Sequence, residues 1–472
     1  MKRFWCVIIL TVLAALFQTA SAGWTRTYGG DGHDYGHCAQ PTPDGGYIIT
    51  VSTPSFNLLK TDSLGHTLWT KLYPNGHARC VQTTSDGCYI FTGSMTSSVG
   101  YVMWLLKTNA DGDSLWSRVY DSDWRLHSGA WVEETDDGGY ITVGNTIRSM
   151  NGIWLRKTNQ VGEELWNQMY GDSYEEFEGV KEASCVKQTS DGGYIVTACI
   201  PPSFSPPPRV RGAIWLLKTD SQGDSVWAKT YGGESEEDTV DIAAPGSVIQ
   251  TPDGGYVVGG TRQLNNSSAV WLLKTDAQGD TLWTRTYGDG AEVCEWLDVT
   301  SEGGYILAGW TTSFGAGGAD FWLIKTDENG DTIWTRTYGG TRFERCHHVR
   351  QTPDGGYILI GETDSYGAGL NDAWLIKTDS LGYIDVKEES HTQVNGNWAV
   401  ITSIGPQIVL RYENRSDGFH ASIFDATGRK VDELHAAGAS GMITWGQGYS
   451  PGVYFVRDMG ESRVTKKAVL VR

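Results

Sequence analysis

Apolar and polar positions follow a short-range pattern along most of the chain. Short runs rich in Tyr, Ile, Leu, Trp and Thr alternate with turns that contain Gly and Asp. Such runs are typical of β-strands, and their apolar residues on both faces are typical of sheets packed between other sheets. The 3.6-residue spacing of amphipathic helices is absent from the sequence, so the pattern predicts an all-β protein.

One phrase recurs along residues 24–382 and divides the pattern into equivalent units. A Tyr-Ile strand follows an Asp-Gly-Gly turn, and a Trp-Leu-Leu-Lys-Thr strand leads through an Asp-x-x-Gly-Asp turn into a Leu-Trp-Thr-x-Thr-Tyr strand. With the strand that precedes Asp-Gly-Gly, each unit holds four strands. Four-stranded units at intervals of about 40–50 residues are the blades of a β-propeller. The turns begin at Asp44, Asp86, Asp137, Asp191, Asp253, Glu302 and Asp354.

The two ends of this repeat predict how the ring closes. The last unit stops near Asp385 without its fourth strand, whereas residues 24–30 are a fourth strand with no unit before them. We therefore expect residues 24–30 to pair with the third strand of the last unit, near 373–379. This closure gives a seven-bladed propeller over residues 23–385 and removes the open sheet edges that favour aggregation.

Tryptophan recurs at two positions of the unit. An aromatic residue that occurs once per blade is typical of packing between blades, so we assign both positions to the core. The Asp-x-x-Gly-Asp turns, such as 327–331, have fewer ligands than a calcium loop, and we expect side-chain-capped turns there. The fourth-strand set is Trp24, Trp69, Trp116, Trp166, Trp227, Trp283 and Trp334, and the third-strand set is Trp104, Trp154, Trp215, Trp271, Trp322 and Trp374.

The repeat resembles that of secreted bacterial β-propellers of the quinoprotein-like and delta-60 kind, which share the strand–DG–strand…D-x-x-G-x-x-x-W pattern. The resemblance covers residues 24–382 and implies the propeller fold. Because such repeats occur in enzymes and in non-catalytic proteins, it implies no particular chemistry. We expect no cofactor, and the sequence gives no basis for a quinone.

The chain after residue 385 changes character. A polar linker, 386–391, precedes short alternating strands in residues 392–472. Three phrases stand out, namely Ile423–Val431, Ser450–Phe455 and the Lys466-Lys467 pair before the final Val-Leu-Val-Arg. Together they resemble the sorting domain of type IX secretion cargo, a small immunoglobulin-like β-sandwich. The resemblance implies recognition by the type IX secretion machinery through the motif residues Asp425, Gly428, Arg429, Gly452, Tyr454, Lys466 and Lys467. An ordinary adhesive β-sandwich is the alternative.

Residues 1–22 have the parts of a secretory signal peptide. A basic head (Met1-Lys2-Arg3) precedes an apolar run over 4–17 and the small-residue site Ala20-Ser21-Ala22, after which we expect cleavage. With the sorting domain, this predicts secretion across the outer membrane to the cell surface or medium. No later apolar run in the sequence is long enough to span a membrane. The net charge of −19 argues against nucleic-acid binding.

Candidate ligand-binding residues are expected on the propeller face that carries the loops of variable length, because variable loops on a rigid scaffold commonly carry binding residues. Acidic loops in 172–182 and 234–241 would suit a cation or a basic partner. Loop aromatics, Phe314 and Tyr366 among them, would stack on sugar rings. The ligand-binding candidates are Trp124, Tyr174, Phe177, Phe343, Glu237 and Asp238.

Metal and catalytic sites have less support in the sequence. The candidate metal ligands His37, His347 and His348 come from neighbouring blades, but they lack the short His or Cys spacings of known metal motifs. Glycoside hydrolysis needs two carboxylates flanking one bond, and Glu295 and Glu344 are candidates. No nucleophile elbow, phosphate loop or dinucleotide fingerprint occurs in the sequence.

Three functions are compatible with these patterns. We favour a non-catalytic scaffold that binds a glycan or a surface protein, because the variable face accompanies no catalytic motif. A glycan-active hydrolase or lyase with carboxylates at the axial mouth is the main alternative, and a structural surface-layer component is the third. A mouth with two facing acids would favour the enzyme, and a plugged mouth would favour binding.

Overall fold

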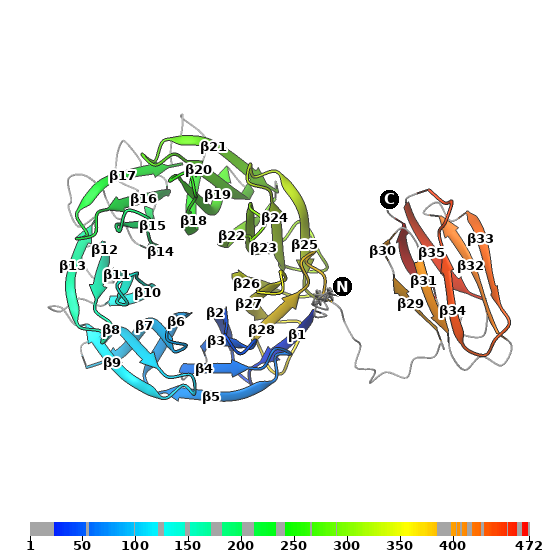
Figure 1. Cartoon of the computed structure of the whole chain (residues 1–472), viewed down its shortest axis with the longest axis horizontal. Coiled ribbons are helices and arrows are strands. Elements are labelled where there is room, and N and C mark those ends of the chain that lie inside the picture. Colours follow the sequence, from blue (N-terminus) through cyan, green and yellow to red (C-terminus); the bar gives the residue numbers. More distant parts are fainter. Residues whose placement is uncertain are drawn as a thin grey trace, which may run out of the picture. The chain divides into compact units, whose positions relative to one another are not determined.

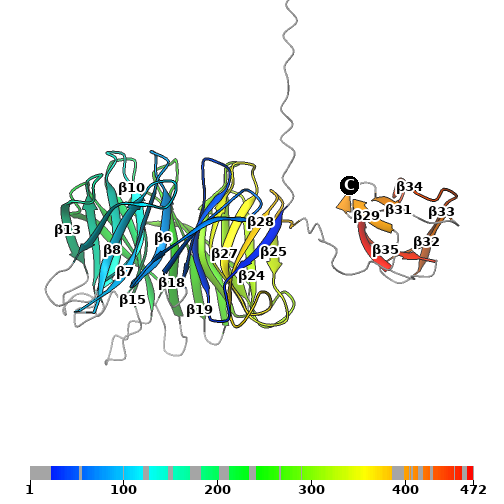
Figure 2. The same cartoon turned by 90° about the horizontal axis from the view of Figure 1, so that it is seen from below.

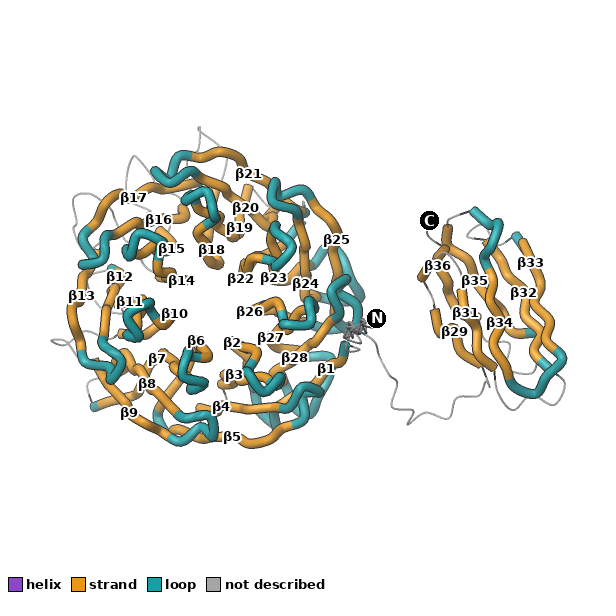
Figure 3. The backbone as a smooth tube through the Cα atoms, viewed as in Figure 1, coloured by secondary structure: helices purple, strands orange, loops and turns teal. Residues whose placement is uncertain are grey.

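The structure is a computed structural model. It describes residues 23–470 except 53–55, 99, 121–126, 147–151, 171–181, 201–211, 233–240, 265–266, 289, 385–397, 403, 406–407, 413–417, 426–428, 451 and 460–464. The described residues form strands, turns and loops, and Figure 3 shows no helix among them. None of them therefore forms a helix that could cross a bilayer. The chain divides into two compact units, Met1–Val386 and Lys387–Arg472.

The described residues of the first unit form seven four-stranded antiparallel sheets, which we number as blades 1 to 7 (Figure 1). Blades 1 to 3 are β2 (Tyr35–Pro41), β3 (Tyr47–Ser52), β4 (Phe56–Thr61) and β5 (Thr67–Tyr73); β6 (Gly76–Thr83), β7 (Tyr89–Ser97), β8 (Gly100–Thr108) and β9 (Ser114–Tyr120); and β10 (His127–Glu134), β11 (Tyr140–Thr146), β12 (Ile153–Thr158) and β13 (Glu164–Tyr170).

The remaining blades repeat this order. Blades 4 to 6 are β14 (Glu182–Gln188), β15 (Tyr194–Ile200), β16 (Ala213–Thr219) and β17 (Ser225–Tyr231); β18 (Asp241–Gln250), β19 (Tyr256–Leu264), β20 (Ser267–Thr275) and β21 (Thr281–Tyr287); and β22 (Glu292–Val299), β23 (Tyr305–Thr311), β24 (Asp320–Thr326) and β25 (Thr332–Tyr338). Blade 7 is β26 (Glu344–Gln351), β27 (Tyr357–Thr363), β28 (Asp372–Thr378) and β1 (Trp24–Tyr28).

Ring closure is confirmed. β1 pairs antiparallel with β28, in a register that runs from Trp24 opposite Lys377 to Tyr28 opposite Ala373. The first strand of each blade lies nearest the axis and the fourth lies at the perimeter, so β1 takes the place at the perimeter that the last repeat cannot fill (Figure 1). In the side view of Figure 2 the strands run between the two faces of the ring.

The fourth-strand tryptophans pack between blades, as predicted. Trp24 lies against Tyr47 of blade 1, with ring centroids 5.7 Å apart, and beneath it the turn residue Gly65 adopts a φ of 79°. A Cβ at Gly65 would lie 2.5 Å from the Trp24 ring, so this turn needs glycine both for its conformation and for space. The third-strand tryptophans Trp104, Trp215, Trp271, Trp322 and Trp374 are buried.

The Asp-x-x-Gly-Asp turns are capped by their own first residue. In one of them the Asp276 carboxylate accepts hydrogen bonds from the backbone N–H groups of Gln278, at 2.9 Å, and Asp280, at 2.8 Å. The same geometry occurs at Asp62, Asp220, Asp327 and Asp379. These carboxylates therefore hold the turns between the third and fourth strands.

A buried lysine ties the two hairpins of every blade together. Lys60, 3% exposed, places its Nζ 2.8 Å from the Asp44 carboxylate of the Asp-Gly-Gly turn and 2.9 Å from the Thr61 carbonyl oxygen. Six further pairs repeat this contact at 2.8–3.0 Å: Lys107–Asp86, Lys157–Asp137, Lys218–Asp191, Lys274–Asp253, Lys325–Glu302 and Lys377–Asp354. The Lys of Lys-Thr-Asp and the acid of Asp-Gly-Gly are thus partners within each blade.

The second unit is a two-sheet sandwich. One sheet holds β29 (Trp398–Thr402), β31 (Ile408–Tyr412) and β34 (Gly441–Trp445), and the other holds β30 (Ile404–Gly405), β36 (Thr465–Leu470), β35 (Gly452–Asp458), β32 (Phe419–Asp425) and β33 (Lys430–Ala436). Leu410 and Trp445 of the first sheet share a hydrophobic core with Ile423 and Val456 of the second. This unit therefore has a core of its own.

Candidate functional site

The seven innermost strands deliver one equivalent side chain each to the axis of the ring. A β-bulge precedes this position in every blade, and the position lies six residues before the acid of the Asp-Gly-Gly turn. The distance to the Asp-Gly-Gly turn is the same in every blade, but the residue type at this position varies. Sequence analysis therefore did not identify the seven positions as a set. The seven residues are Cys38, Cys80, Trp131, Cys185, Ser247, Trp296 and His348.

Three of these side chains meet across the ring. Trp131 of blade 3 stacks on Trp296 of blade 6 with ring centroids 4.2 Å apart and an interplanar angle of 29°, and His348 of blade 7 lies 4.7 Å from Trp296. All three are buried. Since the blades that supply them face one another, the stack fills the channel at this level, and we call it the axial plug.

Ion pairs lie one layer below the plug, two residues further along the same strands. Lys187 pairs with Glu133 at 2.5 Å, and Arg350 pairs with Asp298 at 3.1 Å. The Lys187 ammonium also lies 5.2 Å from the Trp131 ring centroid. Both carboxylates of this layer face a cation, an arrangement that does not resemble the carboxylate pair of a glycoside hydrolase.

Above the plug, the bulge residues include two of the three histidines considered as metal ligands. The His37 and His347 rings lie 6.3 Å apart, whereas His348 belongs to the plug. Burial, followed by the neighbouring His347, Arg79 and His77, lowers the pKa of His37 to about 3. His37 is therefore neutral near pH 7, and its Nε2 lies 2.8 Å from the Ser52 hydroxyl.

The two catalytic candidates occupy different settings. Glu344 is fully buried at the start of β26, where its carboxylate accepts hydrogen bonds from the Gly340 N–H at 2.8 Å, the Thr363 hydroxyl at 3.0 Å and the Ser365 N–H at 3.1 Å. These bonds give Glu344 a structural role in anchoring two loops. Glu295 is the bulge residue of β22 in the preceding blade.

Five of the six ligand-binding candidates lie outside the described residues: Trp124, Tyr174, Phe177, Glu237 and Asp238. The sixth, Phe343, is 54% exposed. Its ring is close to Gly318, where an added Cβ would come within 2.9 Å of it. Phe343 therefore flanks the glycine-rich loop 314–319 of blade 6.

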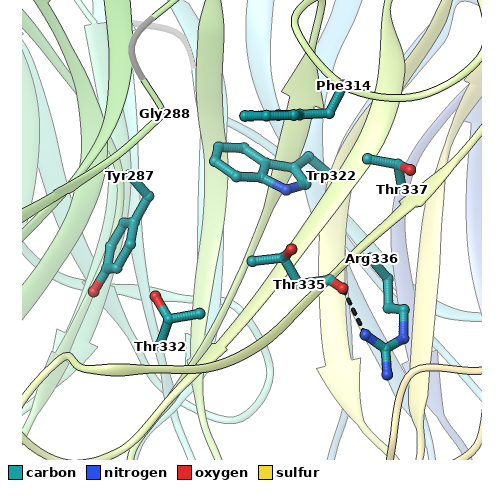
Figure 4. Close-up of a pocket in the computed structure, with 8 residues that line it drawn as sticks. All are labelled: Tyr287, Gly288, Phe314, Trp322, Thr332, Thr335, Arg336 and Thr337. Atoms are coloured by element: carbon teal, nitrogen blue, oxygen red, sulfur yellow. Dashed lines mark hydrogen bonds between the residues drawn. The ribbon is translucent and has the colours of Figure 1, made fainter. Parts of the chain in front are cut away.

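A hollow opens at the other end of this loop, between blades 5 and 6 (Figure 4). Phe314, 46% exposed, lies over Trp322 with ring centroids 5.5 Å apart and an interplanar angle of 37°. The hollow has a volume of about 430 Å³, within the range of small-molecule sites. We call it the blade 5/6 groove, and it is lined by Tyr287, Gly288, Phe314, Trp322, Thr332, Thr335, Arg336 and Thr337.

The groove combines an aromatic surface with hydrogen-bonding groups. Thr335 and Thr337 are exposed on β25, and between them Arg336 donates through Nη1 to the Thr335 carbonyl oxygen at 2.7 Å (Figure 4). Tyr287 forms part of the blade 5 wall, its hydroxyl hydrogen-bonded to the Gly330 carbonyl oxygen at 2.6 Å. The Arg336 guanidinium itself lies over the Trp334 and Tyr383 rings, 5.1 Å and 4.2 Å from their centroids, on the blade 7 side of β25. Threonine hydroxyls beside an exposed phenyl ring suit a polyhydroxylated ligand.

Blade 7 differs from blade 6 at the equivalent position. Its equivalent aromatic pair is Tyr366 over Trp374, at 5.2 Å and 38°, nearly the same geometry as in blade 6. The Tyr366 hydroxyl, however, donates to the Gly339 carbonyl oxygen of blade 6 at 3.0 Å and bridges the two blades. Phe314 has no hydroxyl with which to make the corresponding bridge to Gly288. Sequence analysis noted both aromatics but not this difference.

Comparisons with known proteins found similar solved structures but no matching family. No protein-family model matches the sequence, and no curated protein matches it. Similar solved structures include PorZ, a surface component of the type IX secretion system of Porphyromonas gingivalis, at 10% identity and a TM-score of 0.45, covering 91% of this chain and 58% of that chain. The Dos1 propeller is similar at 10% identity and a TM-score of 0.42, covering 71% of this chain and 74% of that chain. A protein of unknown function from Dyadobacter fermentans is similar at 11% identity and a TM-score of 0.44, covering 76% of this chain and 98% of that chain.

Proposed function

We propose that this chain is an exported, non-catalytic β-propeller that binds a glycan in the blade 5/6 groove. The observation that carries the proposal is the exposed Phe314 ring beside the exposed Thr335 and Thr337 in a hollow of about 430 Å³. The C–H faces of a sugar ring pack on an aromatic ring, while its hydroxyls exchange hydrogen bonds with threonine hydroxyls. The groove supplies both kinds of partner within one site.

The proposed contact surface extends along loop 314–319. Phe343 lies at the Gly318 end of this loop and is the proposed second contact for a longer ligand. Trp124, Tyr174, Phe177, Glu237 and Asp238, which lie outside the described residues, remain proposed ligand contacts. A protein ligand would have to present a side chain or an attached glycan small enough for the groove.

The axial plug supports binding rather than catalysis. An enzyme at the axial mouth would need two carboxylates that converge on one bond. Trp131, Trp296 and His348 fill the channel below that mouth, and the Glu344 carboxylate is engaged by three loop hydrogen bonds. The hydrolase alternative, with Glu295 as the other acid, therefore has less support than the binding function.

Export through the type IX system is the second part of the proposal. Among the motif residues, Asp425 accepts hydrogen bonds from the Arg429 backbone and side chain, each at 3.1 Å, and the Tyr454 hydroxyl donates to the Ser450 carbonyl oxygen at 2.7 Å. Gly428, another of the motif residues, lies outside the described residues. Deletion of 386–472 should leave the propeller in the periplasm, and continued secretion of the shortened chain would contradict this part.

The binding proposal is tested by screening the full chain on a glycan array. We expect retention of at least one glycan, lost in Phe314→Ala and reduced in Phe314→Tyr, whose hydroxyl would bridge to Gly288 as Tyr366 bridges to Gly339. Tyr101→Ala is the matched control, because Tyr101 is also 45% exposed but lies in blade 2. Equal retention by Phe314→Ala and the parent would refute the groove as the binding site.

A further inference from the structure

Two histidines and a glutamate gather on one hairpin of the second unit. The side chains of His420 on β32 and of Glu433 and His435 on β33 offer three donor atoms that all lie within 4.8 Å of one another. Among the described residues, no other group of three or more His, Cys, Asp or Glu side chains meets this criterion. We propose that these three residues form a surface site for a divalent transition-metal ion such as Zn²⁺.

Strand register explains why the three side chains converge. His420 lies directly opposite His435 in the antiparallel ladder, and Glu433 precedes His435 by two residues. Directly opposite residues, and residues two apart on one strand, point to the same face of a sheet. The intervening residues Ala421 and Leu434 are buried in the core, so the proposed ligands occupy the outer face.

The donor atoms suit a tetrahedral ion. Zinc–nitrogen and zinc–oxygen bonds of about 2.0–2.1 Å place neighbouring ligand atoms about 3.3 Å apart. His435 Nε2 lies 3.6 Å from Glu433 Oε1, and His420 Nε2 contacts the same oxygen. Two imidazole nitrogens with one carboxylate favour zinc, nickel or copper over calcium and magnesium, which prefer oxygen ligands.

Lys430 binds the glutamate of this site and offers no ligand to the metal ion. Its Nζ binds Glu433 Oε2 at 2.5 Å, which leaves Oε1 directed at the two imidazoles. Carboxylate ligands of metals are commonly held in this way by a second hydrogen-bonding group. The two imidazole rings stack with centroids 4.0 Å apart, and a nitrogen of each lies near the same Glu433 oxygen.

Three protein ligands leave at least one tetrahedral position open. That position would take water or a donor atom from another molecule. The site is independent of the blade 5/6 groove, since it lies wholly within the second unit.

The test is zinc binding by the full chain, free of any histidine tag and stripped with chelator, in the presence of excess Mg²⁺. We expect calorimetric titration with ZnCl₂ to show one equivalent that His420→Ala/His435→Ala loses, and X-ray absorption of the loaded chain to show two imidazole ligands. His66→Ala is the matched control, because His66 pairs with Asp62 on the surface but has no second histidine. Circular dichroism confirms that each variant is folded.

Two results would overturn the proposal. One is a parent chain that binds no zinc, and the other is a folded double variant that binds as much zinc as the parent. Zinc held by the cysteine thiols would produce the second result, because those residues are unchanged in the variant.

Discussion

The Tyr28 hydroxyl donates a hydrogen bond to the Gly65 carbonyl oxygen at 2.6 Å, which joins the N-terminal strand of blade 7 to blade 1. An equivalent bond connects each fourth strand to the next blade. The other six tyrosines, each bonded to the turn glycine that follows it around the ring, are Tyr73, Tyr120, Tyr170, Tyr231, Tyr287 and Tyr338. The perimeter of the propeller is thus closed by the same contact seven times.

Loss of the N-terminal strand should destabilise the whole propeller. A chain that begins at Asp31 leaves β28 as an open edge and removes the buried Trp24, so we expect the melting temperature to fall by at least about 10 °C. Tyr28→Phe removes only the hydroxyl and should reduce the free energy of unfolding by about 1 kcal/mol. Calorimetry measures both, and an unchanged melting temperature in the shortened chain would show that β1 does not close the ring.

The lysine–acid pairs should make stability sensitive to acid. Partial burial acts to raise the pKa of Asp44, but hydrogen bonds from Lys60 and Thr42 outweigh it and lower that pKa to about 2. Because the folded pKa lies below the unfolded value of about 3.9, the stabilisation is complete above pH 3.9 and is lost as the pH falls toward 2. The pKa is also lowered to about 2 at Asp86, Asp137, Asp191 and Asp253.

Asp44→Ala isolates one of these pairs. We expect a loss of about 2 kcal/mol at pH 7, less than for a fully buried pair because the Asp44 side chain is 58% exposed while Lys60 is buried. The difference from the parent should shrink between pH 4 and pH 2 in urea titrations. Asp113→Ala, which breaks the surface pair with Lys71, is the control and should leave stability unchanged. A pH-independent difference for Asp44→Ala would contradict the ion-pair account.

The axial plug should contribute to stability without contributing to ligand binding. Trp296→Ala removes the ring that contacts both Trp131 and His348, and we expect the free energy of unfolding to fall by about 3–5 kcal/mol. Trp296→Phe should retain most of that energy. Glycan retention should be the same in both variants, and its loss in a folded Trp296→Ala chain would move the binding site to the axis.

His37 should not titrate near neutral pH. Its pKa of about 3 lies below the ordinary value of about 6.5. Between these two pH values the imidazole is therefore protonated in the unfolded chain and neutral in the folded chain. Its contribution to stability is therefore complete above pH 6.5 and is lost as the pH falls toward 3. Proton NMR of the imidazole signals, assigned with His37→Asn, measures the pKa directly. A midpoint near 6.5 would show that the ring is solvated.

The propeller could be predicted from the sequence because its determinants are local and repeated. Every blade has its own Asp-Gly-Gly turn and Lys-Thr-Asp strand, and the displaced strand at 24–30 identified both the closure and the blade number. The partnership of Lys60 with Asp44 escaped prediction, because sequence spacing does not show which of the repeated charged residues are buried together.

The groove and the plug depend on departures from the repeat, and this limited their prediction. Trp131 and Trp296 meet across the ring only because of the blade positions from which they come. The groove lies beside Phe314, which takes the place of Tyr366 in an otherwise similar loop and lacks its hydroxyl. The sequence does not show this difference, because the glycine that each ring faces, Gly288 or Gly339, belongs to the end of the neighbouring blade.

Binding without turnover is the central claim, and one measurement tests it most directly. The glycan retained most strongly by the full chain is incubated with it for hours while bound glycan and newly formed reducing or unsaturated ends are both quantified. The account predicts retention that depends on Phe314, with no new chain ends above the level without protein. New ends that accumulate with time and disappear in Glu295→Ala or Glu344→Ala would contradict it and identify the propeller as an enzyme.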